Sequence, residues 1–175
     1  MARTPYNPAD ARRGATPTSD PDAPAPWYAE GLRFKCTQCG GCCTGGPGFV
    51  WFDEDEGAAM AKAKGLDTAE FYERYAKKKF GRWSLDEVRV ARGQYDCGFL
   101  ARPGGLDSPG RCTIYADRPT QCRTWPFWDS NVQSPEAWAE AAEDCPGMKL
   151  PGETGGHFVP LEAITVELQR NPAGL

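Results

Sequence analysis

The segment Cys36-Thr37-Gln38-Cys39-Gly40-Gly41-Cys42-Cys43 decides the expected fold, because it holds four of the chain's eight cysteines. Gaps of two residues let a tight turn bring successive sulfurs toward one metal centre. Glycines within the segment relieve the backbone where it must approach closely. The segment therefore predicts a metal-binding knuckle, and we expect thiolates, rather than a large apolar core, to organise the chain around it.

Four further cysteines follow later in the chain: Cys97, Cys112, Cys122 and Cys145. We take all eight as candidate metal ligands. Two four-cysteine sites are arithmetically possible, for example Cys36, Cys39, Cys42 and Cys145 in one and Cys43, Cys97, Cys112 and Cys122 in the other. One site with spare thiols is the alternative, because an isolated cysteine often serves as a small buried apolar residue. Consecutive side chains are expected to diverge, so that Cys43 serves a second site or bridges two.

The spacing leaves two kinds of metal open. Structural zinc favours paired C-x2–4-C knuckles, whereas iron–sulfur clusters favour three cysteines at gaps of two and a remote fourth, often followed by proline. Cys36, Cys39 and Cys42 form such a run, and Cys145 precedes Pro146. The pattern leans toward a 4Fe–4S cluster, although it lacks the cysteine that follows three residues after the run in ferredoxins.

Charge and hydropathy narrow the function classes. The net charge of −4 and the isoelectric point of about 5.1 argue against a nucleic-acid binder that relies on bulk positive charge, and they give no reason to expect a membrane surface. We therefore expect neither nucleic acid nor a membrane as a partner. No window approaches the roughly 20 apolar residues of a membrane span. The N-terminal arginines are not followed by the apolar stretch of a signal peptide. We therefore expect a cytoplasmic protein, where thiols stay reduced and metal binding is favoured over a disulfide framework.

Composition predicts an α+β fold of a small, irregular, loop-rich kind, stapled by metal. Glycine and proline number 20 and 16 of 175 residues, and such chains bury little apolar surface per residue, so they need staples. Residues 1–26 read as a disordered Pro/Ala-rich tail, because nothing there offsets the entropy of ordering. Residues 27–175 are expected to form the metal-binding domain.

The local pattern predicts short elements. We expect a strand over 49–52 and a helix after Asp53. A second helix is expected to run from a cap at Thr68 to Lys79, with its lysines at the solvated end. Residues 82–115 read as strands and turns, with a hairpin loop over 102–111. Three more helices are expected after Asp117, after Ser134 and over 160–171.

The order of these motifs resembles one family. The knuckle is followed by Cys97-x-Phe99-Leu100, by Cys112-Thr-Ile-Tyr115-x-x-Arg118-Pro119-x-x-Cys122-Arg123-x-x-Pro126-Phe127, and by Cys145-Pro146-Gly147. This arrangement resembles the CxxCxxCC cysteine-cluster family of zinc- or iron-chelating domains over roughly Lys35 to Met148. The resemblance implies a cytoplasmic protein that binds zinc or an iron–sulfur cluster through these cysteines. A similar cluster accompanies a flagellin lysine methylase, so the resemblance also points to a redox or methyl-transfer association.

We consider supporting roles for the residues beside the cysteines. Cations next to ligand candidates can lower thiol pKa values and offset thiolate charge: Arg33, Lys35, Arg111, Arg118 and Arg123. Trp125, Phe127 and Trp128 can limit solvent access to a cluster, or simply belong to the core. His157 is the only histidine, and a lone loop histidine is usually exposed, so we do not expect it to bind metal.

Three functions remain open from the sequence. The first is a protein that holds an iron–sulfur cluster or zinc and serves in electron transfer or redox sensing, with a protein redox partner. The second is a structural zinc module for protein–protein interaction. The third is an accessory or oxidoreductase enzyme, although four-thiolate saturation argues against open-site chemistry.

Overall fold

The structure is a computed structural model that describes residues 24–106 and 108–171. These residues form two compact units. Unit 1 comprises Gln38–Arg123, and unit 2 comprises the described residues up to Thr37 together with those from Thr124 onward. Residues 1–23 of the predicted tail lie outside the described residues, and the single domain expected over 27–175 stays a prediction.

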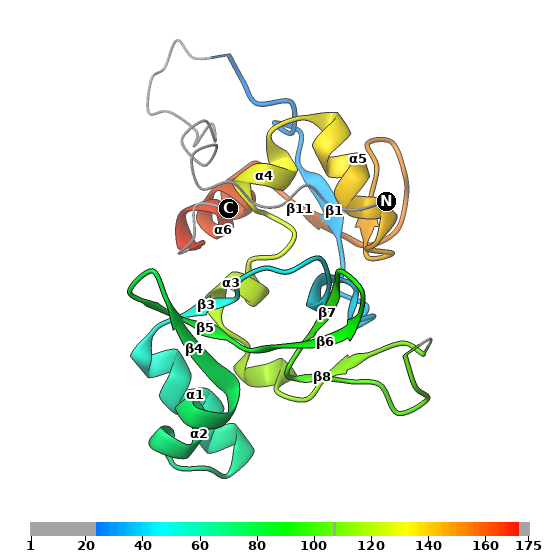
Figure 1. The fold of residues 1–175 in the computed structure, drawn as a ribbon. Coiled ribbons are helices and arrows are strands. Elements are labelled where there is room, and N and C mark those ends of the chain that lie inside the picture. The colour runs from blue at the N-terminus through cyan, green and yellow to red at the C-terminus, as the bar shows by residue number, and fades with distance from the viewer. Residues whose placement is uncertain (1–23, 107, 172–175) are drawn as a thin grey trace. The chain divides into compact units, whose positions relative to one another are not determined.

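Unit 1 contains two helices whose starts follow from their caps (Figure 1). Helix α1 spans Glu54–Lys64, and Asp53 and Glu56 form a reciprocal capping box at its start. This confirms the helix expected after Asp53, since the paired carboxylates satisfy backbone N–H groups that the first turn leaves open. Helix α2 spans Thr68–Tyr75, and its cap is Asp67 rather than Thr68.

Two three-stranded antiparallel sheets follow in unit 1. One has the order β3-β5-β4, with β3 at Trp51–Phe52, β5 at Arg82–Leu85 and β4 at Ala76–Lys79. The other has the order β2-β7-β6, with β2 at Thr44–Gly45, β7 at Gln94–Cys97 and β6 at Glu87–Ala91. The strands expected over 49–52 and 82–115 are therefore present in shortened form.

The lysine run corrects one prediction. The second helix ends at Tyr75, and residues Ala76–Lys79 form a strand instead of the helical end that we expected. Ala76 is buried and pairs with Leu85, while Lys79 pairs with Arg82. The lysine run pairs with β5 in a tight hairpin, and β5 also pairs with the more distant β3, so strand pairing overrides the local helical preference.

The remaining elements of unit 1 are short. A two-stranded sheet joins β8, Leu100–Ala101, to β9, Arg111–Cys112, and confirms the hairpin loop expected between them. Two 3-10 turns, η2 at Gly41–Cys43 and η3 at Tyr115–Asp117, precede β2 and α3 respectively. Helix α3, Thr120–Arg123, is the short helix expected after Asp117.

Unit 2 combines one sheet with three helices. The sheet has the antiparallel order β10-β1-β11, with β10 at Met148–Lys149, β1 at Leu32–Phe34 and β11 at His157–Val159. Helix α4 spans Asp129–Val132, α5 spans Pro135–Glu143 and α6 spans Leu161–Arg170. Ser134 caps α5 through the N–H of Ala137, as its position before a proline predicts. The final helix is confirmed, with Ile164 and Leu168 buried.

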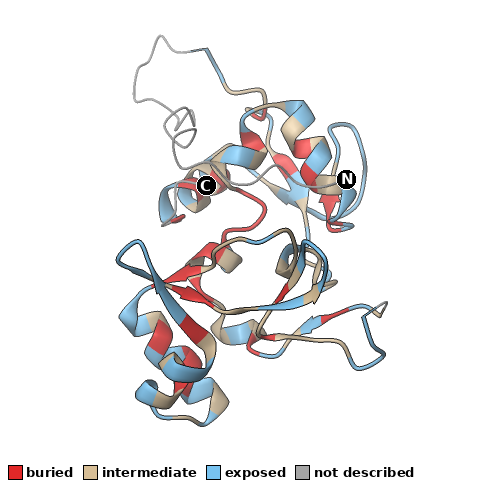
Figure 2. Ribbon diagram, in the orientation of Figure 1, coloured by how far each residue is buried: buried red, intermediate tan, exposed pale blue. Residues whose placement is uncertain are grey.

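Each unit has its own apolar core. In Figure 2 the buried residues of unit 1 gather on α1, α2 and the sheet β3-β5-β4, where Met60 and Phe71 have no exposed surface. The core of unit 2 surrounds the fully buried Trp138. Apolar packing therefore helps to hold each unit together, whereas we expected thiolates rather than an apolar core to do so. Short helices and short antiparallel strands in small sheets confirm the α+β, loop-rich class.

None of the helices in residues 24–106 and 108–171 is long and apolar enough to cross a membrane.

Candidate metal centre

The cysteines divide between the two units. Unit 1 contains six of them, Cys39, Cys42, Cys43, Cys97, Cys112 and Cys122, and unit 2 contains Cys36 and Cys145. No disulfide joins any of the eight, all of which lie in the described ranges.

The knuckle of unit 1 depends on close backbone approach. Gly40 has a φ of 80°, in the left-handed region that favours glycine. A Cβ there would lie 2.9 Å from Leu100 Cδ1 and 3.0 Å from the carbonyl oxygen of Gly110. Since Leu100 pairs with Cys112 across β8 and β9, this approach seats the knuckle beside the hairpin that carries Cys112.

The strand register brings the next cysteines together. Thr44 faces Asp96 in the β2–β7 pair, so the preceding residue, Cys43, emerges beside Cys97. On the other side of β7, Cys97 faces Glu87 of β6. Cys97 is therefore flanked by a thiol from the turn η2 and by a carboxylate from β6.

The sulfurs of Cys42 and Cys43 lie 3.9 Å apart, so our expectation that consecutive side chains diverge is wrong. The 3-10 turn η2 tightens the backbone at this point and brings both sulfurs together. With Zn–S bonds of about 2.3 Å, the edge of a four-thiolate tetrahedron is about 3.8 Å. The pair therefore has the sulfur spacing that one tetrahedral ion requires.

Electrostatic coupling extends this pair to a group of four. The pKa of Cys43 is raised first by its hydrogen bond with Cys42 and by burial, and then by the charges of Cys42, Cys97 and Cys122. Burial raises the pKa of Cys122 well above its ordinary value, with further increases from Cys97 and Cys42. Burial also raises the pKa of Cys97 to about 11, and Cys42 contributes to that increase. Every pair in this group of four therefore interacts.

Cys112 lies next to the same group. Burial raises the pKa of its thiol, and the charge of Cys42 raises it further. The charge of Arg118 partly opposes the increase in the pKa of both Cys112 and Cys122. The guanidinium of Arg118 is held by the carbonyl of Tyr115 at 2.9 Å and lies 3.7 Å from the centre of the Tyr115 ring. Of the cations predicted beside the cysteines, Arg118 thus has the expected electrostatic effect.

The other predicted cations have different contacts. The guanidinium of Arg123 lies 3.4 Å from Glu56 and bonds the hydroxyl of Thr120. Arg33 of unit 2 lies over the ring of Phe158. Arg111 is exposed at the start of β9.

Three cysteine sulfurs of unit 1 accept a hydrogen bond from the backbone N–H two residues later in the chain. The N–H of Gly41 donates to Cys39 Sγ at 3.5 Å, and the N–H groups of Phe99 and Ile114 donate to Cys97 and Cys112. In each case the donor lies two residues after the cysteine. Such bonds stabilise the thiolate relative to the thiol, and the thiolate is the form that binds metal.

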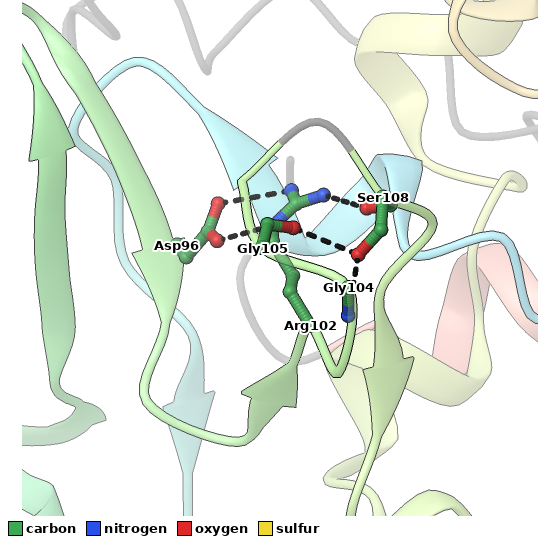
Figure 3. A network of polar contacts seen from close by, with 5 residues as sticks. All are labelled: Asp96, Arg102, Gly104, Gly105 and Ser108. Carbon is green, nitrogen blue, oxygen red and sulfur yellow. Dashed lines mark hydrogen bonds and ion pairs between the residues drawn. The ribbon is translucent and has the colours of Figure 1, made fainter.

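An ion pair that the sequence did not reveal fixes the frame of this group (Figure 3). Asp96, which precedes Cys97, accepts bonds from Arg102 at 2.6 and 3.2 Å. Arg102 also donates to the carbonyl of Ser108 at 2.8 Å, and the Ser108 hydroxyl bonds the backbone of Gly104 and Gly105. The pair therefore ties the loop between β8 and β9 to strand β7.

The bond from Arg102 holds the pKa of Asp96 below its ordinary value. The same bond raises the pKa of Arg102, and the charge of Cys43 adds to that increase, so this cation lies within electrostatic reach of the thiol group. No sequence signal links residues 96 and 102 to the cysteines, except that Asp96 immediately precedes one of them.

Unit 2 places its two cysteines on adjacent segments. Phe34 pairs with Met148 in the β1–β10 ladder, and the N–H of Lys35 donates to the carbonyl of Gly147 at 3.0 Å. The segment that leads to Cys36 therefore runs beside the segment that follows Cys145. Cys145 is buried in the core of unit 2, and Cys36 is half-buried. The proposed partition of cysteines between two sites stays a prediction.

The aromatic side chains and the histidine of unit 2 serve the fold. Trp125 and Phe127 belong to its apolar core, with Trp128 packed against them, which agrees with the plainer of our two interpretations. His157 lies exposed in strand β11, opposite Phe34.

The arrangement in unit 1 gathers thiols without closing a complete ligand shell. Within residues 24–106 and 108–171, no group of three or more His, Cys, Asp or Glu side chains is arranged to hold a metal ion. The donor set nevertheless fits zinc or iron, since clustered thiols with amide donors and nearby guanidinium groups supply soft ligands and balance their charge.

A family model matches residues 35–146, more than half of the chain, and carries the description "CxxCxxCC: Putative zinc- or iron-chelating domain". The chain belongs to this CxxCxxCC family. The match includes every cysteine of the chain and confirms the resemblance stated from the motifs. Membership supports zinc or iron binding in general. No solved structure matches the chain.

Proposed function

We propose that unit 1 of this CxxCxxCC protein binds one zinc or iron ion through four thiolates, and that Cys42, Cys43, Cys97 and Cys122 are the ligands. The observation that carries the proposal is the 3.9 Å separation of the Cys42 and Cys43 sulfurs. Two sulfurs at that spacing fit one tetrahedral ion. Each iron of a 4Fe–4S cluster instead takes a single cysteine, so the pair favours a mononuclear centre.

The surrounding charges support the same proposal. Four thiolates around a divalent ion carry a net charge of −2. Burial raises the pKa of Cys112 and Cys122, and the charge of Arg118 partly opposes that increase. The charge of Cys43 adds to the increase that the bond to Asp96 causes in the pKa of Arg102. Both cations are therefore placed to offset that charge. When bound, the ion would join the knuckle, strand β7 and helix α3, and metal binding would complete the fold of unit 1.

The remaining cysteines have secondary roles in the proposal. Cys112 is the alternative fourth ligand, because it interacts with Cys42, Cys97 and Cys122. Cys39 extends the knuckle, and Cys36 and Cys145 of unit 2 remain candidate ligands of a further site. Four-thiolate saturation leaves no open position for substrate, so a structural role or electron transfer in the cytoplasm fits better than catalysis.

The second candidate is an iron–sulfur protein that serves in electron transfer or redox sensing with a protein partner. The three amide-to-sulfur hydrogen bonds at Cys39, Cys97 and Cys112 favour it. Hydrogen bonds to cysteine sulfurs help to set the reduction potential of such clusters.

Anaerobic purification followed by zinc, iron and acid-labile sulfide analysis tests the proposal. We expect about one zinc or iron per chain and little sulfide. Stoichiometric sulfide with broad visible absorption that bleaches on reduction supports the second candidate instead. The variants Cys42→Ser and Cys97→Ser should lose the metal, whereas His157→Ala should retain it. Full metal content in both cysteine variants contradicts the ligand assignment.

A further inference from the structure

The hairpin of β4 and β5 has a turn that the fold alone does not explain. Lys79 pairs directly with Arg82, so Phe80 and Gly81 form a two-residue turn with φ values of 48° and 79°. Turns with two positive φ values favour Asn-Gly, and a bulky residue is strained at the first position. The side chain of Phe80 is also 85% exposed, so burial does not offset the strain.

Positive charge is concentrated on the same hairpin. Four of the six residues from Lys77 to Arg82 are cations, in a chain whose net charge is −4. All four are exposed. Lys77 pairs with Asp86 at 2.9 Å, and Lys78 lies 5.5 Å from the centre of the Trp83 ring. The hairpin is therefore locally basic, although the whole chain is acidic.

The strand register places aromatic rings on one face with these cations. Trp51 and Lys77 both face Ser84 from opposite sides, and residues two apart in a strand share a face, which adds Lys79 and Arg82. The guanidinium of Arg82 lies 4.8 Å from the centre of the Trp51 ring.

Two more rings complete this surface. Phe49 stacks on Trp51 with ring centres 4.8 Å apart. The ring of Phe80 meets Phe49 edge-on at 5.9 Å. We call Phe49, Lys79, Phe80 and Arg82, together with the buried Trp51 whose ring Arg82 covers, the basic aromatic face.

We propose that the basic aromatic face binds single-stranded nucleic acid, with a base stacked on Phe80 and phosphates bound by Lys79 and Arg82. Exposed rings stack bases of any sequence, and adjacent cations contact the backbone. The acidic charge of the whole chain excludes nucleic-acid binding through bulk positive charge, and our expectation from the sequence rested on that. The proposed binding depends only on the local positive charge of this face. An anionic membrane fits less well, because Phe80 is the one largely exposed ring of this face, and insertion needs a larger apolar surface.

Fluorescence anisotropy of a labelled twelve-nucleotide oligouridine, titrated with the full chain at several salt concentrations, tests the proposal. Phe80→Asn puts the residue that the turn favours at its first position, so the melting temperature should stay equal or rise while binding weakens at least about fivefold. Lys79→Gln with Arg82→Gln should lower the salt slope by about 1.4, which is two phosphates at about 0.7 each.

A matched control removes the same charge elsewhere in unit 1. Arg89→Gln with Arg92→Gln alters the hairpin of β6 and β7 and should leave the affinity within twofold of the wild type. The proposal is overturned if the wild type does not bind the oligonucleotide, if Phe80→Asn binds it equally well, or if the control weakens binding as much. Binding to phosphatidylserine vesicles without binding to the oligonucleotide also overturns it.

Discussion

Removing the Asp96–Arg102 ion pair tests how unit 1 is held together. The two side chains are only 7% and 17% exposed, and Arg102 makes a further bond to Ser108. Breaking a buried pair by removing one partner costs about 3–5 kcal/mol, because the remaining charge stays buried. Since Arg102 keeps some contact with solvent, we expect Arg102→Gln to lower the free energy of unfolding by about 3 kcal/mol at pH 7.

The decrease in the free energy of unfolding caused by Arg102→Gln should become smaller at lower pH. Arg102 holds the pKa of Asp96 below its ordinary value. The pair therefore stabilises the fold above the carboxyl pKa of the unfolded chain, which is about 4, and this contribution is lost as pH falls through the lower pKa of the folded state. In the variant, the unpaired carboxyl takes up a proton more readily. The difference between wild type and variant should therefore shrink as the pH is lowered from 7 to 3.

Urea denaturation of the reduced, metal-free chain, followed by circular dichroism across that pH range, measures the effect. Arg92→Gln, which removes an exposed cation from the same unit, is the control and should cost less than about 0.5 kcal/mol. The double variant Asp96→Asn with Arg102→Gln should be more stable than Arg102→Gln alone, because no charge remains buried without a partner. A loss below about 1 kcal/mol, or one that does not change with pH, refutes the reasoning.

Three further predictions concern the knuckle, the thiols and the helix caps. In denaturation experiments Gly40→Ala should lower the free energy of unfolding by about 1–2 kcal/mol, because Gly40 has a positive φ and an added Cβ would meet Leu100. The same variant should bind zinc more weakly, and an unchanged zinc affinity would contradict this prediction. Zinc binding should release protons at pH 7 and should tighten as the pH rises toward 9, because burial raises the pKa of Cys97 to about 11. Calorimetry in buffers of different ionisation enthalpy measures the proton release, and an affinity that does not change with pH argues against thiol ligands. Glu56→Ala should lower the free energy of unfolding in urea by about 1–2 kcal/mol, because the Glu56 carboxylate accepts hydrogen bonds from the backbone N–H groups of Asp53 and Thr120. A decrease within experimental error would show that these bonds do not stabilise the helix starts.

The sequence predicted features that depend on local chemistry. Asp53 and Ser134 begin helices because each can satisfy N–H groups within its own first turn. The order and spacing of the cysteines identified the family, since those residues carry the donor atoms themselves. The α+β class followed from the same short elements and from the high content of turn residues.

Features that depend on contacts between separate segments were missed. Residues Ala76–Lys79 look helical locally, and their pairing with Arg82–Leu85 decides the strand. The convergence of the Cys42 and Cys43 sulfurs depends on a 3-10 turn that the glycine pattern does not specify. The bond between Asp96 and Arg102 joins a strand to a loop, and spacing in the sequence gives no sign of it.

The most direct test of the account measures metal content in the reduced, purified protein and in Cys42→Ser and Cys97→Ser, with His157→Ala as the control. The account predicts about one zinc or iron ion per chain in the wild type and in the control, and a loss of most of it in both cysteine variants. Metal-free wild-type protein after purification in the presence of zinc and iron, with no binding on titration, would contradict the central claim.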